Sequence, residues 1–151
     1  METKSQKLDI NPDIHETYGF LILSKNNVLI ATFSKEKKEI NFQSKIEKID
    51  IYNRRGGASA GRFRPMRIER NLKTFKFIEE QLEKIFIKDT LLNISGLIIA
   101  GNKEALKLYL SYLSFKGLTG QLNEYITSLI EIEYYGELGF NEAIELSMLN
   151  N

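Results

Sequence analysis

Three short apolar runs constrain the fold of this chain more than any other feature. They are YGFLILS at 18–24, VLIATFS at 28–34 and ISGLIIAG at 94–101. Each has the length of a buried strand, and no apolar run approaches the roughly 20 residues that a membrane span needs. The Asn-Asn pair at 26–27 is a turn signal between the first two runs. The sequence therefore predicts a β-hairpin and, later in the chain, a third buried strand.

Two further segments alternate between apolar and polar residues, as half-buried strands do. In the first, 39–52, the alternation changes phase near Glu47, so we expect one long strand or two short ones, with a bulge or bend there. The second is SLIEIEYY at 128–135, which predicts the last strand.

Helical spacing begins after residue 71. The residues that repeat at intervals of three or four along one face are Leu72, Phe75, Ile78, Leu82, Ile85 and Phe86. They predict a long helix, and Pro65 suits its first turn. The segment 102–113 opens with an Asn cap and predicts a second helix, and a third follows a turn at Gly136 and Gly139.

The predicted order is β-β-β-loop-α-β-α-β-α, which is typical of an α/β domain: a mixed five-stranded sheet with helices packed on it. A basic glycine loop lies between the N-terminal strands and the long helix. The length of 151 residues suits a single core. We expect 17–149 to form this domain and the polar segment 1–16 to be flexible, without the apolar stretch of a secretory signal.

The charges are distributed very unevenly. All six arginines lie between residues 54 and 70: Arg54, Arg55, Arg62, Arg64, Arg67 and Arg70. Ten basic and three acidic residues occupy 45–76, whereas 120–151 holds six glutamates and no Lys or Arg. A charge run is often only a solvated face, but the planar guanidinium matches phosphate oxygens and stacks on bases. The arginine segment therefore predicts a surface that contacts RNA or phosphate.

Enzyme motifs are weak or incomplete in this chain. GASAG at 57–61 fits the Gly-x-Ser-x-Gly pattern of a hydrolase nucleophile, but the one histidine, His15, precedes Ser59 instead of following it. There is no nucleotide-binding Gly-Lys-Ser/Thr sequence. One histidine, no cysteine and scattered carboxylates give no metal-ligand spacing, so we expect no metal and no cofactor.

Paired carboxylates and tyrosines are open to a structural interpretation. We interpret Glu79–Glu80 as part of a solvated helix face, and Glu131 and Glu133 as part of a solvated strand face. Tyr134 and Tyr135 can stack on bases, but a strand-end aromatic pair more often divides between core and rim.

The glycines give the arginine segment a special backbone. Gly56 and Gly57 permit positive φ and let the main chain approach a partner closely, because no Cβ intervenes. Two adjacent glycines also leave a loop mobile until a partner orders it. The pattern indicates a flexible tip on a basic stalk that enters a negatively charged crevice.

The stretch RRGGASAGRF, followed by a basic helix, resembles the catalytic loop of eukaryotic and archaeal class 1 peptide chain release factors. ISGLIIAG and YYGELGFNEAIELS extend this resemblance over residues 17–148, in order. It implies that 17–149 is the middle domain of such a factor, without the stop-codon-reading domain or the C-terminal partner-binding domain.

The resemblance assigns roles residue by residue. Gly56 and Gly57 match the two glycines of the family's Gly-Gly-Gln tip, and Arg55 matches the basic residue before it. Ala58 stands where the family has its glutamine, which is also the family's methylation target. The later matches are Ser59, Ala60, Arg62 and Phe63.

The resemblance implies a cytoplasmic, monomeric catalytic cofactor of the ribosome rather than a free-standing enzyme. The tip, Gly56, Gly57 and Ala58, would enter the peptidyl transferase centre and promote hydrolysis of peptidyl-tRNA, weakened by Ala58. The residues expected to contact large-subunit rRNA are Arg54, Arg55, Arg62, Arg64 and Arg67. A GTPase release factor would be the partner of the full-length protein. The alternative is a non-catalytic ribosome-binding domain resembling the ribosome-rescue relatives, which lack the Gly-Gly-Gln tip.

Overall fold

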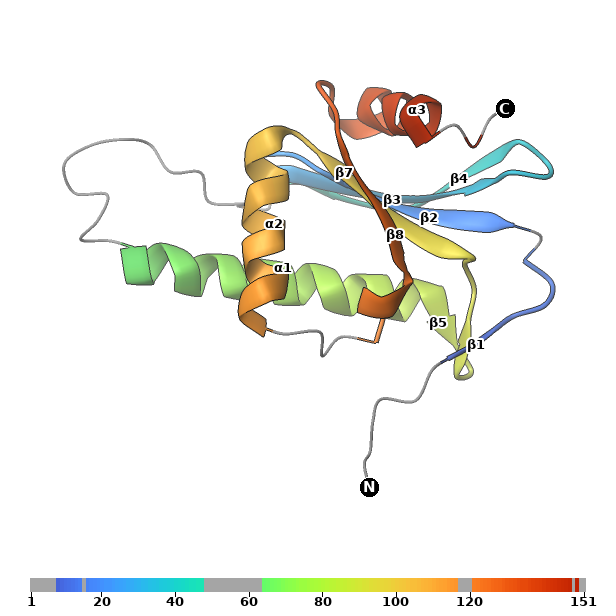
Figure 1. The fold of residues 1–151 in the computed structure, drawn as a ribbon, viewed down its shortest axis with the longest axis horizontal. Coiled ribbons are helices and arrows are strands. Elements are labelled where there is room, and N and C mark those ends of the chain that lie inside the picture. Colours follow the sequence, from blue (N-terminus) through green and yellow to red (C-terminus); the bar gives the residue numbers. More distant parts are fainter. Residues whose placement is uncertain (1–7, 15, 48–63, 117–120, 148, 150–151) are drawn as a thin grey trace.

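The computed structural model describes residues 8–14, 16–47, 64–116, 121–147 and 149, with side chains left out at 64–71 and 115–116. Figure 1 shows one sheet with helices on both of its faces. The elements are β1 (Asp9–Ile10), β2 (Thr17–Leu23), β3 (Asn27–Ser34), β4 (Glu39–Glu47), α1 (Arg64–Phe86), β5 (Ile87–Lys88), β6 (Leu91–Leu92), β7 (Gly96–Gly101), α2 (Lys103–Lys116), a 3-10 turn (Asn123–Tyr125), β8 (Ile126–Glu131) and α3 (Gly136–Ser147).

The main sheet is mixed and has five strands in the order β4-β3-β2-β7-β8. Within this sheet β3 pairs antiparallel with both β2 and β4, and β7 pairs in parallel with both β2 and β8. The three central strands are buried almost throughout, whereas the edge strands β4 and β8 are mostly exposed or half-buried. Burial on both faces explains why the central strands read as continuous apolar runs.

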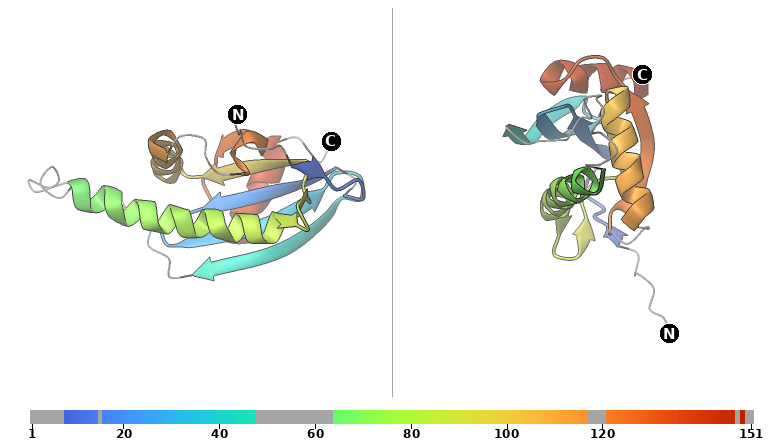
Figure 2. Two further views of the ribbon diagram at one scale, coloured as in Figure 1. Left: turned by 90° about the horizontal axis from the view of Figure 1, so that it is seen from below. Right: turned by 90° about the vertical axis from the view of Figure 1, so that its left-hand side faces the viewer.

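The two faces of the sheet carry separate apolar clusters. On one face, Leu21 and Ile99 pack with the buried side of α1 and α2. On the other, Phe20 and Ile98 pack with Phe140 of α3. Figure 2 shows this layering, with α3 on one side of the sheet and α1 on the other. The predicted α/β fold with a mixed five-stranded sheet is therefore confirmed.

A small second sheet, β1-β6-β5, lies beyond the C-terminal end of α1 and was not predicted. Asp9–Ile10 falls within the segment 1–16 that we expected to be flexible, yet it pairs in parallel with Leu91–Leu92. The N–H of Asn11 also donates to the Leu92 carbonyl oxygen at 2.8 Å. Backbone hydrogen bonds thus fix the N-terminal segment at Asp9–Ile10. This strand of two residues is too short to show an alternation of apolar and polar residues.

Two details of the edge strands differ from the sequence interpretation. The register shift lies where Ile30 pairs with Ser44 and Ala31 with Phe42, so β4 carries a bulge at Gln43 that was not predicted. The phase change expected near Glu47 involves residues 48–52, which lie outside the described residues. The last strand, β8, ends at Glu131, so the tyrosines at 134 and 135 belong to the turn before α3. They are 57% and 66% exposed, which corrects the expectation of a core-and-rim pair.

The helix α3 begins at Gly136, whose φ of +62° favours glycine, and includes Gly139 within its second turn. A Cβ on Gly139 would lie 2.7 Å from the Tyr134 carbonyl oxygen. A glycine at this position therefore lets the helix lie directly against the preceding turn.

Candidate nucleic-acid interface

The residues predicted to act on RNA divide into two groups in the structure. Gly56, Gly57 and Ala58 lie outside the described residues, and so do three of the predicted RNA-binding arginines, Arg54, Arg55 and Arg62. The backbone of the other two, Arg64 and Arg67, forms the first turns of α1. The described part of the candidate interface is therefore α1, the helix that carries Arg64 and Arg67.

The helix α1 has 23 residues, and its part from Leu72 onward is anchored in the core. Leu72 is half-buried against the core, and Phe75, Ile78 and Leu82 are at most 1% exposed. Burying each such side chain stabilises the fold by about 1.5–3 kcal/mol. In Figure 2 the first turns of α1 extend beyond the sheet, so the helix begins at one end of the molecule.

Aromatic side chains pack α1 against α2. Phe75 of α1 makes an edge-on contact with Tyr109, with ring centroids 5.1 Å apart, and a tilted contact with Tyr112 at 5.4 Å. Both tyrosines lie in α2 and are at most 5% exposed. Burial, followed by the nearby Glu79 carboxylate and Tyr112, raises the pKa of the Tyr109 hydroxyl well above its ordinary value. Tyr109 therefore stays neutral inside the core at neutral pH.

A buried hydrogen bond crosses the same contact. The Tyr112 hydroxyl donates to Glu79 Oε1 at 2.7 Å, and Glu79 is only 5% exposed. This corrects the interpretation of Glu79–Glu80 as a solvated pair, which holds for Glu80 alone. Nearby, the Gln121 N–H donates to Glu83 Oε2 at 3.3 Å, so a second α1 carboxylate holds the backbone just before the 3-10 turn.

Cationic residues continue along the described part of α1. Lys73, Lys76 and Lys84 are exposed, and Arg64, Arg67 and Arg70 precede them in the same helix. The opposite side of the sheet carries acidic groups, because α3 and the turn before it hold Glu133, Glu137, Glu142 and Glu145. Because Glu79, Glu80 and Glu83 also lie in α1, its excess of positive charge comes from the arginines of its first turns, which are suited to binding a polyanion.

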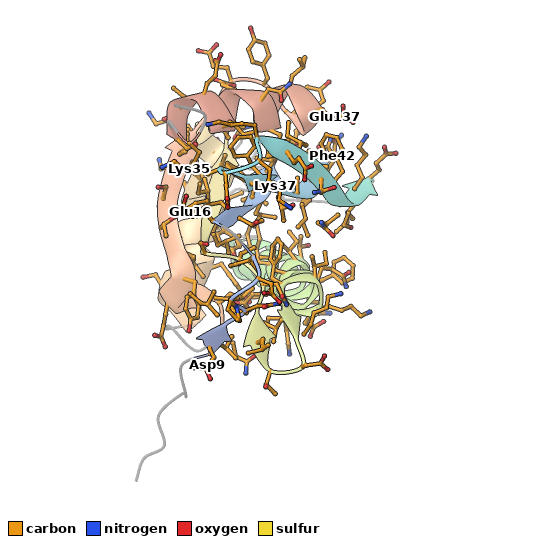
Figure 3. All side chains as sticks on the ribbon, turned by 90° about the vertical axis from the view of Figure 1, so that its right-hand side faces the viewer. Asp9, Glu16, Lys35, Lys37, Phe42 and Glu137 are labelled. Carbon is orange, nitrogen blue, oxygen red and sulfur yellow. The ribbon has the colours of Figure 1, made fainter. Side chains whose placement is uncertain are left out.

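A polar hollow of about 180 Å³ lies elsewhere, near the start of β2 and the β3–β4 turn. Its lining includes Asp13, Ser34 and Lys37. Figure 3 views the molecule from this end, with Lys35, Lys37 and Glu16 labelled near the strand ends. Its lining residues all fall between Asp13 and Asn41, and none of them lies in α1.

Two classes of site find no support within the described ranges. There, no group of three or more His, Asp or Glu residues is placed to hold a metal ion. No helix of that part of the chain is long and apolar enough to cross a membrane.

Comparisons with known proteins identify a sequence family for this chain and solved structures that share its fold. The family model described as "eRF1 domain 2" matches residues 17–150. Among curated relatives, the "Eukaryotic peptide chain release factor subunit 1" of Blepharisma americanum is 33% identical over 133 residues, which cover 87% of this chain and 29% of the relative. The chain thus spans about three-tenths of that relative's length.

Solved structures share the fold at low sequence identity. The archaeal translation termination factor aRF1 matches with a TM-score of 0.65 and 14% identity, over 89% of this chain and 35% of that one. Dom34 of S. cerevisiae, titled a translation termination-like factor that interacts with Hbs1, matches with a TM-score of 0.53 and 13% identity, over 92% of this chain and 37% of Dom34.

Proposed function

The chain belongs to the eRF1 domain 2 family, and from this premise we propose that it acts in translation termination as a domain that docks on the rRNA of the large ribosomal subunit. The observation that carries the proposal is the family match over 17–150, which includes the arginine–glycine segment with both tip glycines. We take 17–149 as the functional domain.

The proposed docking uses guanidinium–phosphate pairs. The arginines assigned to it are Arg54, Arg55, Arg62, Arg64 and Arg67. Guanidinium groups bind phosphate oxygens through two parallel hydrogen bonds, so they set the register of the protein on RNA. The anchoring of α1 in the core supports this role, because it fixes the helix whose first turns carry Arg64 and Arg67.

The proposed chemistry is hydrolysis of the ester in peptidyl-tRNA. Water attacks the ester carbonyl carbon, the bond to the tRNA ribose oxygen breaks, and the products are a peptide carboxylate and a tRNA hydroxyl. Gly56 and Gly57 let the backbone approach, and the Ala58 N–H donates to the oxygen that gains charge. The glutamine amide that would orient the water is missing at Ala58, and loss of one such group costs about 2.7–4 kcal/mol of transition-state stabilisation.

The proposed partners are peptidyl-tRNA, large-subunit rRNA and, for the full-length protein, a GTPase release factor. The fold neighbour Dom34 interacts with Hbs1, which supports a protein partner of this kind. The second candidate function is a non-catalytic, rescue-factor-like ribosome-binding domain. Ala58 and the likeness to Dom34 favour it, whereas retention of Gly56 and Gly57 opposes it.

The test is single-turnover peptide release on ribosomes that carry peptidyl-tRNA, with the unsubstituted chain and its Ala58→Gln variant. We expect the variant to release peptide about 10²–10³ times faster, because it regains one polar group at the reacting centre. Equal rates for both forms would contradict the catalytic proposal and leave the non-catalytic one.

A second variant separates docking from chemistry. Replacing the five assigned arginines by glutamine, in the Ala58→Gln background, should abolish binding to isolated large subunits and reduce the salt dependence of any residual binding. Unchanged subunit binding would show that these arginines do not dock the domain. The matched control replaces Lys35, Lys37 and Lys38 in the β3–β4 turn, which should leave binding within about twofold.

A further inference from the structure

The outer surface of α3 and the turn before it expose four large apolar side chains. Tyr134 is 57% exposed, Tyr135 66%, Leu138 65% and Leu146 54%. The inner side of the same helix is well packed, with Phe140 and Ala143 fully buried. A surface helix normally carries polar residues opposite its buried stripe. These four apolar residues therefore keep more than half of their surface exposed within the described part of the chain.

The turn that carries the tyrosines is held in one shape by α3. The Glu142 carboxylate accepts the N–H of Glu133 at 2.9 Å and the N–H of Tyr134 at 3.0 Å. The Gly139 N–H donates to the Tyr135 carbonyl oxygen at 3.1 Å. The tyrosines and Leu138 are thus presented on an ordered backbone, which lowers the conformational entropy lost when a partner binds.

The charge around these residues selects the class of partner. From residue 120 onward the chain holds six glutamates and no Lys or Arg, and Glu133, Glu137 and Glu145 are exposed. Figure 3 shows Glu137 at the end of α3 above β4, where Lys45 donates to it at 3.1 Å. Such a surface repels nucleic acid and anionic lipid. It also repels a second copy in a two-fold contact, because like charges would face each other.

We propose that Tyr134, Tyr135, Leu138 and Leu146, together with the surrounding glutamates, form a docking surface for a polypeptide segment rich in Lys and Arg and interspersed with apolar residues. The apolar side chains supply the buried contact area, and the carboxylates select the sign of the partner and accelerate its encounter. This surface, the α3 face, goes beyond the proposed RNA docking. It lies across the sheet from α1 (Figure 1), so both can be occupied at once.

The test measures direct binding of fluorescent peptides to the whole chain by anisotropy. The probe is a peptide as long as α3, 12 residues, in which Lys and Arg alternate with Leu. One control peptide replaces Leu by Gly at unchanged charge, and another replaces Lys and Arg by Glu. We expect the probe to bind at least tenfold more tightly than either control, with affinity that falls as salt rises.

Chain variants then locate the binding. The Tyr135→Ser/Leu138→Ser double variant should weaken probe binding at least tenfold, and Glu133→Lys/Glu145→Lys should do the same by reversing charge. The control is Leu110→Ser on α2, which removes a leucine that is 43% exposed at another place and should change affinity by less than about twofold. The charge-reversed variant keeps the test decisive where the serine variant fails to fold.

Several results would overturn the proposal. Equal affinity for the probe and for its Gly-containing control would show that the peptide binds through charge alone and that the apolar side chains of the α3 face take no part. Binding of no peptide, or dimerisation of the chain that the Leu138 variant abolishes, would exclude the proposed occupant. None of these results depends on ribosome binding, so failure here is distinct from failure of the proposed function.

Discussion

At the scale of single residues, Glu79 and Tyr112 carry the contact that fixes α1. Their hydrogen bond lies within an apolar cluster, where both side chains are 5% exposed. A buried carboxylate is costly to desolvate, and a hydrophobic residue of similar volume often gives equal stability. A polar pair at such a place sets one register between two helices, because any sliding of α1 along α2 breaks the hydrogen bond.

Replacing Tyr112 by Phe should therefore destabilise the domain by about 1–3 kcal/mol, because the Glu79 oxygen loses this donor within the core. Urea unfolding followed by circular dichroism measures the change. The matched control is Tyr134→Phe, which removes a hydroxyl from a side chain that is 57% exposed and should leave the free energy of unfolding unchanged. An equal, small effect of both substitutions would show that the buried hydrogen bond adds no net stability.

At the scale of elements, the central strands were predictable because burial on both faces leaves a continuous apolar run. The helices were predictable from spacing and from Pro65 and the Asn102 cap. The two-residue strands β1, β5 and β6 were not, because pairing of two residues leaves no periodicity. Glu79 was misread for a related reason: the helical pattern marks a face by its apolar residues, and a buried acid among them looks solvated.

The candidate site, too, was predictable from the sequence only in part. Clustered arginines and adjacent glycines are visible in the sequence, since they are unusual residue types in one short segment. The contacts that hold α1 in place are not visible in the sequence, because Phe75 lies far along the chain from Tyr109 and Tyr112 and meets them only when α2 packs on α1.

The packing of α3 gives a prediction for this scale. Gly139→Ala would gain about 0.5–1 kcal/mol from helix propensity if space were free. The added Cβ would lie 2.7 Å from the Tyr134 carbonyl oxygen and 3.0 Å from Ile132 Cδ1. A backbone atom cannot rotate away, so we expect a net destabilisation of about 1–3 kcal/mol in urea unfolding.

The exposed residue Asn141 lies in the same helix and supplies the control. Asn141→Ala should be neutral or slightly stabilising, because it meets no backbone atom and raises helix propensity. If Gly139→Ala stabilised the domain as much as Asn141→Ala, then α3 would not depend on close approach to the turn before it.

At the scale of the whole molecule, α1 connects the core to the proposed tip. Leu72 is half-buried against the core and Arg64 lies eight residues earlier, so about 12 Å of helix separates these two residues. A rigid connector of fixed length sets how far the tip reaches once the body has docked. Reacting groups must be held closely in place, since an error of about 1 Å can reduce a rate about 100-fold.

Lengthening this connector tests whether α1 sets that reach. Four alanines inserted between Arg70 and Asn71 add about 6 Å and rotate the tip by about 40°. They precede Leu72, so the core contacts and the free energy of unfolding should stay within about 1 kcal/mol. In the Ala58→Gln background we expect single-turnover peptide release to fall at least 100-fold, because the tip no longer meets the ester.

The same four alanines inserted between Glu36 and Lys37, in the β3–β4 turn, provide the matched control. This turn lies at the other end of the sheet from the start of α1 (Figure 1), and surface turns tolerate insertions. Release should then stay within about threefold of the parent rate. If the α1 insertion also left release unchanged, the helix would act as a flexible tether, and the buried Glu79–Tyr112 contact would have no part in placing the tip.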